Sequence, residues 1–262
     1  MSEYTLASSP AEEPEQELTA MSFFEHLEEL RRRIIHSLLA VAVAFGACWY
    51  FAEGIFGLMQ QPIMDALRNN GLEQKLVVLS PTDAFNMYLK VGLVTGVFVA
   101  SPFILFQVWL FVSPGLYKNE KRYVLPFMFS SVALFLSGGL FGYKVVFPSA
   151  LDFLLAYGRQ FEPMITIGAY TDLFLTIILG LGIVFELPIL VFFLSIMGVI
   201  TAGWMWRNFR YSFLAIFIAS AIITPTSDIM NLCIFAAPML ALYILSMGIA
   251  WIFNPGGKKK PA

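Results

Sequence analysis

Six long apolar stretches constrain this chain more than any other feature of its sequence. They cover about residues 34–52, 84–106, 123–146, 170–197, 209–223 and 229–253. A helix needs roughly 20 apolar residues to cross the hydrocarbon core of a bilayer, and it satisfies its own backbone polar groups there. Hydrophobic residues make up 58% of the chain and charged residues 13%, about half the usual charged share. The sequence therefore predicts an all-α membrane protein with about six transmembrane helices, of which the fifth is short.

The two ends of the chain differ from its apolar middle. Residues 1–20 contain five glutamates and no basic residue, the reverse of the positively charged start of a signal peptide. We expect a disordered acidic tail there. Residues 21–253 are expected to form one membrane domain, followed by a basic tail at 254–262.

Lys and Arg residues are distributed unequally between the loops. Eleven of the 16 lie near the two chain ends and in the segments 107–122 and 198–210, whereas four lie in or beside the alternating loops 53–83 and 147–169. Cytoplasmic loops carry the excess of Lys and Arg. We therefore expect both termini in the cytoplasm, and the loops 53–83 and 147–169 to form apolar caps on the outer membrane surface.

Composition also argues against several classes of function. The net charge of −2 and the absence of a basic stripe give no support for nucleic-acid binding. Two histidines are too few for a metal cluster, and Cys48 and Cys233 lie inside apolar runs, so we expect no metal, cofactor or disulfide. The H-E-x-x-H and G-x-S-x-G motifs are missing from the sequence, which argues against an intramembrane enzyme.

Glu186 is an ionisable residue inside the fourth apolar stretch. Such residues are costly at membrane depth and usually functional. Pro188, two residues later, removes a backbone donor and predicts a kink beside the carboxyl group. Two interpretations remain open: a polar wall that contacts a substrate or a partner helix, and a glutamic acid hydrogen-bonded to a neighbouring helix for packing alone.

The segment before the first span is amphipathic and strongly charged. Phe23, Phe24, Leu27 and Leu30 recur at helical spacing, as in a helix that lies at the membrane interface. Glu28 with Arg32 and Glu29 with Arg33 are spaced as i,i+4 ion pairs, each worth a few tenths of a kcal/mol. The segment is either a self-paired anchor or a site where one carboxylate is available to a cationic ligand.

The loop at 107–122 combines aromatic and charged residues. Trp109 and Tyr117 suit the membrane interface, and Pro114 with Gly115 marks a turn. Phe111, Leu116 and Tyr117 would form an apolar surface beside Glu120. This composition permits a peptide-docking patch.

Five ordered pieces of the sequence resemble the TatC family, the signal-peptide receptors of the twin-arginine translocation pathway. They are His26–Arg33 (HLEELRRR), Pro62, Ser101–Trp109 (SPFILFQVW) continuing to Pro114–Arg122 (PGLYKNEKR), Phe185–Pro188 (FELP) and Thr224–Asp228 (TPTSD). With the six apolar stretches, the resemblance covers about residues 22–253. It implies a concave six-helix bundle in the inner membrane that serves as receptor and scaffold for the transport of folded proteins.

The resemblance also implies roles for individual residues. Those expected to engage a twin-arginine signal peptide are Glu29, Glu120 and Phe111, with Arg31, Leu116 and Tyr117 beside them. Glu186 matches an intramembrane glutamate on the concave face, and Pro62 and Asp228 match outer-side positions implicated in transport. The implied partners are twin-arginine signal peptides, TatA- and TatB-like single-span subunits, further copies of the chain and membrane lipids.

A secondary transporter of a small solute or proton is the competing hypothesis. It would use Glu186 as its proton site and would need further charges at membrane depth. Lys90 and Asp172 come nearest to this, and both are expected at the edges of spans.

Overall fold

The computed structural model describes residues 23–112, 124–158, 160–161, 163–223 and 229–253. Within these ranges the secondary structure is helical, apart from turns and one isolated bridge between Val77 and Thr166. Its elements are α1 (Phe23–Tyr50), α2 (Ala52–Met59), α3 (Gln61–Asn69), α4 (Pro81–Val112), α5 (Val124–Phe141), the π-helical turn η3 (Gly142–Val146), α6 (Phe147–Tyr157), α7 (Ile167–Val184), α8 (Leu187–Ile196), α9 (Ala202–Arg207), α10 (Phe209–Ile223) and α11 (Ile229–Phe253).

Five helical segments are long and apolar enough to cross a membrane, and a sixth is shorter. The five are Phe24–Tyr50, Pro81–Val112, Pro126–Tyr157, Ile167–Ile196 and Leu232–Ile252. The short one is α10, whose 15 residues span about 22 Å at 1.5 Å per residue, less than the roughly 30 Å of a hydrocarbon core. The all-α membrane fold and the short fifth span are as the sequence predicts.

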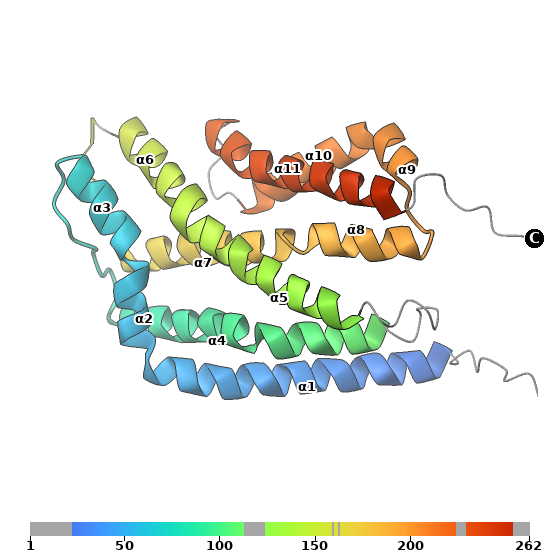
Figure 1. The fold of residues 1–262 in the computed structure, drawn as a ribbon. Helices are drawn as coiled ribbons and strands as arrows, with labels where there is room; N and C mark the ends of the chain where they lie inside the picture. The colour runs from blue at the N-terminus through green and yellow to red at the C-terminus, as the bar shows by residue number, and fades with distance from the viewer. Residues whose placement is uncertain (1–22, 113–123, 159, 162, 224–228, 254–262) are drawn as a thin grey trace, which may run out of the picture.

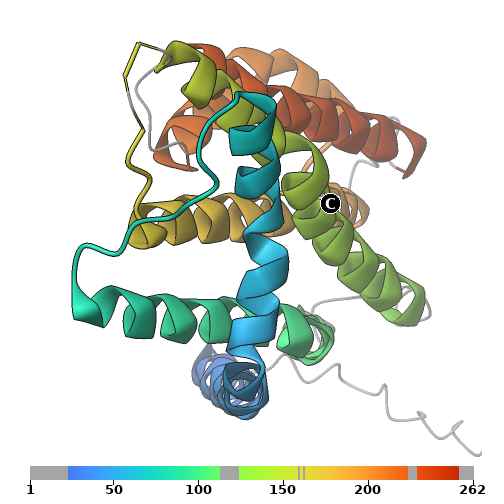
Figure 2. The same ribbon diagram turned by 90° about the vertical axis from the view of Figure 1, so that its left-hand side faces the viewer.

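The helices are arranged with two distinct ends (Figure 1). At one, called here the N-terminal end, α1 begins, α4 and α8 end, and α9 lies nearby. At the other, called the cap end, α2 and α3 run across the bundle from α1 toward α6 (Figure 2). Between the ends α4 packs against α1, α5 and α7, while α11 packs against α8 and α10.

The first helix differs from the sequence prediction. The amphipathic segment and the first span form one uninterrupted helix of 28 residues, about 42 Å long, instead of a separate interfacial helix. No glycine or proline lies between Phe23 and Phe45 to end the helix. The charged residues of 25–33 therefore extend directly from the spanning part of α1.

The third span is also longer than predicted. It was expected to end at residue 146, but the helix continues through η3 and α6 to Tyr157. Pro148 has no N–H to donate to the carbonyl four residues before it. The chain adapts by a π-helical turn, in which the N–H of Phe147 donates to the carbonyl of Gly142. The predicted loop thus begins only after α6, whereas α2 and α3 do form a cap from residues 52–69.

A cluster of buried side chains holds this cap on the bundle. It includes Phe56, Ile63 and Leu67 from α2 and α3, and Phe147 and Phe174 from α6 and α7. All are less than a tenth exposed. The cap is therefore attached by apolar packing over both of its helices.

Glycines allow α1 and α4 to approach closely. Gly92 and Gly96 lie one helical turn apart on α4 and face α1. A Cβ atom at Gly96 would lie 2.9 Å from the backbone nitrogen of Phe45 and 3.0 Å from its Cα. Because these are backbone atoms, they cannot move aside as a flexible side chain would. Small residues at such contacts are typical of packed membrane helices.

We predict that Gly96→Ala destabilises the protein by about 1–3 kcal/mol, the usual cost of overpacking. The matched control is Gly46→Ala on α1, where a Cβ atom would meet nothing within 4 Å; it should leave stability unchanged or raise it slightly, because Ala favours helix. Thermal unfolding in detergent micelles measures both. Equal melting temperatures for the two variants would contradict the close α1–α4 contact.

Candidate functional site

Glu29 and Arg33 connect α1 to α4 near the N-terminal end. A guanidinium nitrogen of Arg33 lies 3.0 Å from Glu29 Oε1, and its other terminal nitrogen donates to Gln107 Oε1 at 3.1 Å. Glu29 is only 9% exposed, and Gln107 is buried on α4. One of the two predicted i,i+4 pairs therefore forms, and it is fixed in place by a residue of another helix.

Glu29 keeps one carboxylate oxygen for a further partner. Its Oε2 atom is buried and accepts no hydrogen bond from any residue in the described part of the chain. The N–H groups of Arg33 Nε and Trp109 Nε1 are also buried, and neither donates a hydrogen bond to any residue in the described part of the chain. A buried carboxylate oxygen without a donor is costly, so a cationic donor that reaches Oε2 would gain a charge-assisted hydrogen bond.

Aromatic rings stack near the start of α1 and at the end of α4. Phe111 stacks on His26, with ring centroids 4.3 Å apart and an interplanar angle of 16°. Trp109 packs on Phe193 of α8 at a centroid distance of 4.1 Å. Phe111 is thus brought to the same end as Glu29, as the resemblance implies, because His26 lies one helical turn before Glu29 on α1.

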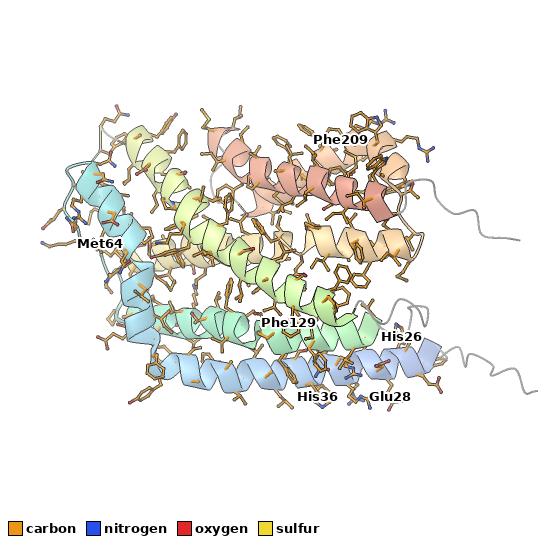
Figure 3. All side chains as sticks on the ribbon, viewed as in Figure 1. His26, Glu28, His36, Met64, Phe129 and Phe209 are labelled. Carbon is orange, nitrogen blue, oxygen red and sulfur yellow. The ribbon has the colours of Figure 1, made fainter. Side chains whose placement is uncertain are left out.

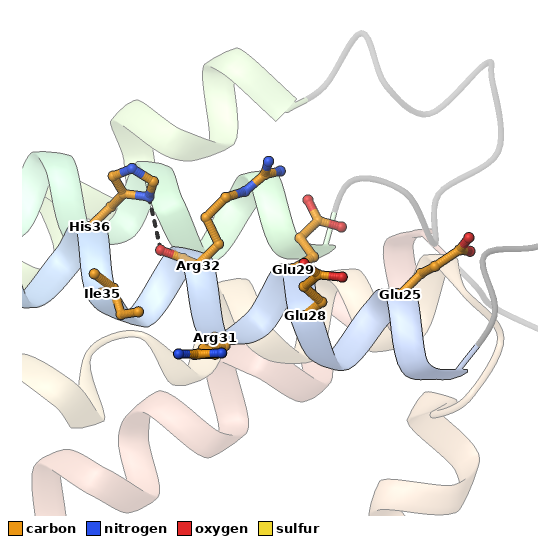
Figure 4. A pocket seen from close by; sticks show the side chains of 7 residues that line it. All are labelled: Glu25, Glu28, Glu29, Arg31, Arg32, Ile35 and His36. Carbon is orange, nitrogen blue, oxygen red and sulfur yellow. Dashed lines mark hydrogen bonds between the residues drawn. The ribbon is translucent and has the colours of Figure 1, made fainter.

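The other charged side chains of this segment surround an open cleft of about 540 Å³ along α1 (Figure 4). It is lined by Glu25, Glu28, Glu29, Arg31, Arg32, Ile35 and His36. Arg31 points to the opposite side of α1 from Glu29 and Arg32. Glu28 is exposed, so the two adjacent glutamates have very different surroundings.

Glu186 lies at a break between α7 and α8. Helix α7 ends at Val184, and α8 begins at Leu187 with Pro188 in its first turn. Ser131 of α5, fully buried, donates its hydroxyl hydrogen to Glu186 Oε2 at 2.5 Å. The interruption beside Pro188 follows the prediction, whereas Ser131 was not predicted as the hydrogen-bond partner. Glu186 Oε1 is buried without a hydrogen bond to any described residue.

Lys90 and Asp172 form an ion pair between α4 and α7 with an N···O distance of 2.5 Å, and their side chains are 46% and 57% exposed. Asp172 precedes Glu186 by 14 residues, or about 21 Å along a helix. The two charges therefore neutralise one another near the cap end and are remote from Glu186. Pro62 lies at the cap end too, in the first turn of α3.

The predicted residues thus fall into separate groups. His26 and Glu28 lie at one end of α1, and Met64 of the cap lies at the other end of the molecule (Figure 3). Glu29 and Phe111 are together at the N-terminal end, Glu186 is at the α7–α8 break, and Pro62 is in the cap. Leu116, Tyr117, Glu120 and Asp228 lie outside the described residues. The described residues hold no group of three or more His, Cys, Asp or Glu side chains that could bind a metal ion.

Fold and site together define a multi-pass helical membrane protein with a charged, aromatic site at one end and a carboxyl group at a helix break. Residues 25–238 match the family model of TatC, the Sec-independent protein translocase protein. The chain belongs to the TatC family. The prediction from the sequence motifs, that the chain is a TatC-family component of a protein translocase, is confirmed. The alternative of a small-solute transporter receives no support.

Individual relatives agree with this assignment. The TatC protein of Koribacter versatilis is 65% identical over 246 residues, which cover 94% of this chain and 91% of the relative. A Helicobacter pylori TatC protein is 38% identical over 234 residues, or 89% of this chain and 90% of the relative. A crystal structure of a twin-arginine translocase receptor, TatC, superposes with a TM-score of 0.79 at 35% identity, covering 87% of this chain and 99% of the other.

We predict that Ser131→Ala lowers the free energy of unfolding by about 1–3 kcal/mol, because it leaves the half-buried carboxyl group of Glu186 without its hydrogen-bond donor. The matched control is Ser130→Ala on the same helix: Ser130 is exposed, and its hydroxyl donates only to the carbonyl of Pro126. Unfolding of both variants in mixed micelles makes the comparison. If Ser130→Ala cost as much as Ser131→Ala, the hydrogen bond to Glu186 would not matter for stability.

Proposed function

We propose that this chain is the receptor subunit of a twin-arginine translocase and binds Arg-Arg signal peptides of folded cargo at the N-terminal end of its bundle. Family membership supports a role in protein translocation, since the relatives are Sec-independent protein translocase proteins. The buried carboxylate of Glu29 supports the site most directly: one oxygen holds Arg33, and the other meets no donor within the described residues.

The chemistry of the two basic side chains favours arginine at such a site. A guanidinium is a planar fork with five donors, so it can bind a carboxylate and a neighbouring acceptor at once, whereas an ammonium is a compact, strongly hydrated charge. Arg33 already binds both Glu29 and Gln107 in this way. A signal-peptide arginine directed at Glu29 Oε2 would complete the carboxylate's hydrogen bonding.

The second arginine of the signal peptide requires a second acceptor. We assign it to Glu120, with Leu116, Tyr117 and Phe111 as the adjoining apolar surface and Arg31 as a basic residue of the same motif. The resemblance in the loop motif supports this assignment. The apolar part of the signal peptide would then run along the bundle toward Glu186.

We further propose that both termini face the cytoplasm of the inner membrane. The basic residues of α1 and α9 lie at the same end of the bundle (Figure 1), and an excess of Lys and Arg marks the cytoplasmic side. Pro62 and Asp228 are then on the outer side. TatA- and TatB-like single-span subunits, further copies of this chain and lipids would cover the exposed apolar faces of the bundle.

We predict that the lipid-embedded protein binds an Arg-Arg signal peptide at least about tenfold more tightly than its Lys-Lys twin. Glu29→Gln should reduce Arg-Arg binding by about tenfold to a hundredfold, since a hydrogen bond to a charged group contributes roughly 1.5–3 kcal/mol. The exposed neighbour provides the matched control, because Glu28→Gln removes the same charge one residue away. Titration of labelled peptides against nanodiscs measures all of these affinities.

The outcomes are distinguishable. Loss of binding in both glutamate variants would indicate a general effect of negative charge, and not a site at Glu29. Equal affinity for the Arg-Arg and Lys-Lys peptides would contradict the receptor proposal itself. A Glu29→Gln/Glu120→Gln double variant that binds like the unsubstituted protein would exclude the carboxylate assignment.

For Glu186 we predict that substitution by Ala impairs transport more than stability. The change removes the acceptor of Ser131, but a serine hydroxyl within a helix can turn to a backbone carbonyl of its own helix, so no polar group needs to be left unsatisfied. Cargo transport into inverted vesicles should fall at least about tenfold, while the amount of inserted protein and its melting temperature change little. A large loss of inserted protein would instead support the packing interpretation of this residue.

A further inference from the structure

The break between α2 and α3 leaves backbone carbonyls without their helical donors. Helix α2 ends at Met59 and α3 begins at Gln61. Pro62 has no N–H, so it cannot donate to the carbonyl of Leu58, four residues earlier. The carbonyl of Met59 belongs to the last turn of α2, where intrahelical donors run out. The Met59 carbonyl lies in a buried contact, where an unsatisfied carbonyl is costly, whereas the Leu58 carbonyl lies in an exposed one.

Two tyrosines from distant parts of the chain supply the missing donors. Tyr143 of η3 donates its hydroxyl hydrogen to the carbonyl of Leu58 at 3.0 Å. Tyr170 of α7, only 2% exposed, donates to the carbonyl of Met59. Adjacent carbonyls at the end of one helix are therefore bound from two other elements, 85 and 111 residues away in sequence.

The local structure around Tyr143 is unusual in a way that supports this contact. Tyr143 lies in the π-helical turn that precedes Pro148. A π-turn adds one residue to a helical turn, changes the direction of the following side chains, and occurs often at functional sites. In the same turn, Gly142 lets the helix approach α7, because a Cβ atom there would lie 3.1 Å from Ile178 Cδ1.

A third attachment restrains the far end of the cap. After α3, the N–H of Val77 donates to the carbonyl of Ile165 at 2.8 Å, and the N–H of Ile167 donates to the carbonyl of Val77 at 2.9 Å. Apolar packing keeps the cap on the bundle but is not directional. The hydroxyl contacts are directional, and they act at the junction of α2 with α3, where the cap bends.

We propose that Tyr143 and Tyr170 are positioning residues that fix the α2–α3 cap across the end of the bundle, and that Pro62 acts through Tyr143 by leaving the Leu58 carbonyl to its hydroxyl. The link to transport rests on the proposed translocase function, in which Pro62 is an outer-side residue. The link to the cap's position rests on the hydrogen bonds alone and is tested separately.

Hydrogen exchange of the full-length protein in nanodiscs tests the contacts. Tyr143→Phe and Tyr170→Phe should each raise exchange of residues 52–69 by roughly fivefold, the loss expected for one hydrogen bond, and leave the peptides of α8 and α11 unchanged. Tyr88→Phe is the matched control: its ring packs on Phe56 at the same end, and its hydroxyl has no hydrogen bond to any described residue. No change in 52–69, or an equal rise in every helix, would overturn the proposal.

A double variant tests the role of Pro62. Pro62→Ala restores an N–H that can donate to the Leu58 carbonyl, so Tyr143→Phe should raise exchange of residues 52–69 by less than about twofold in the Pro62→Ala background. If Tyr143 only filled space in the core, Pro62→Ala would not reduce the effect of Tyr143→Phe on exchange. If the two substitutions acted independently, with the same fivefold increase in both backgrounds, Pro62 would not act through Tyr143.

Transport assays connect the cap to the function. The Tyr143→Phe/Tyr170→Phe variant should bind the Arg-Arg peptide as tightly as the unsubstituted protein but transport cargo several-fold more slowly. Unchanged transport with increased cap exchange would overturn the positioning role. Absence of any Arg-Arg preference in the unsubstituted protein would instead contradict the proposed receptor function. The exchange results would still show whether the two tyrosine hydrogen bonds hold the cap in place.

Discussion

Every helix break in this bundle must satisfy its own carbonyl groups, because hydrocarbon offers no water to do so. Pro102 inside α4 cannot donate to the carbonyl of Phe98, and Ser101 supplies its hydroxyl hydrogen to that carbonyl at 2.7 Å. Tyr143 does the same for the carbonyl that Pro62 cannot reach. At these two prolines, a hydroxyl side chain therefore donates to the carbonyl that the missing backbone N–H leaves free.

The same constraint explains why polar residues gather at particular places. Helix α8 begins at Leu187, immediately after Glu186, with Pro188 in its first turn. The carboxyl group at this interruption accepts a hydrogen bond from the buried hydroxyl of Ser131 on another helix. The Pro62 junction binds two tyrosines. Hydrogen bonds at the breaks thus connect α5 to the α7–α8 junction, and η3 and α7 to the end of α2. The uninterrupted α1 is instead joined to α4 along its spanning part by glycine contacts.

Much of this architecture could be predicted from sequence, because spans depend on local apolar length and family motifs occupy short segments. The interruption beside Glu186 followed from Pro188. The partners did not, since Ser131 and Tyr170 lie 55 and 111 residues from the groups they bind. The end of the third span was missed because the π-turn lets the helix pass Pro148. Burial on α1 also separates Glu29 from Glu28, which the charge spacing left equivalent and only the family resemblance distinguished.

That last distinction matters for how an arginine could be recognised near water. An exposed ion pair contributes little, because solvent screens it and both side chains lose freedom on pairing. Glu29 is instead held by Arg33, which Gln107 fixes in turn. Its carboxylate is thus ordered and largely desolvated before any ligand arrives, and a preorganised acceptor reduces the entropic cost of binding. The opposite charges of Glu29 and Arg33 cancel on a formal count, yet they leave one carboxylate oxygen ordered and without a donor among the described residues. Its orientation is what a planar guanidinium can distinguish from an ammonium.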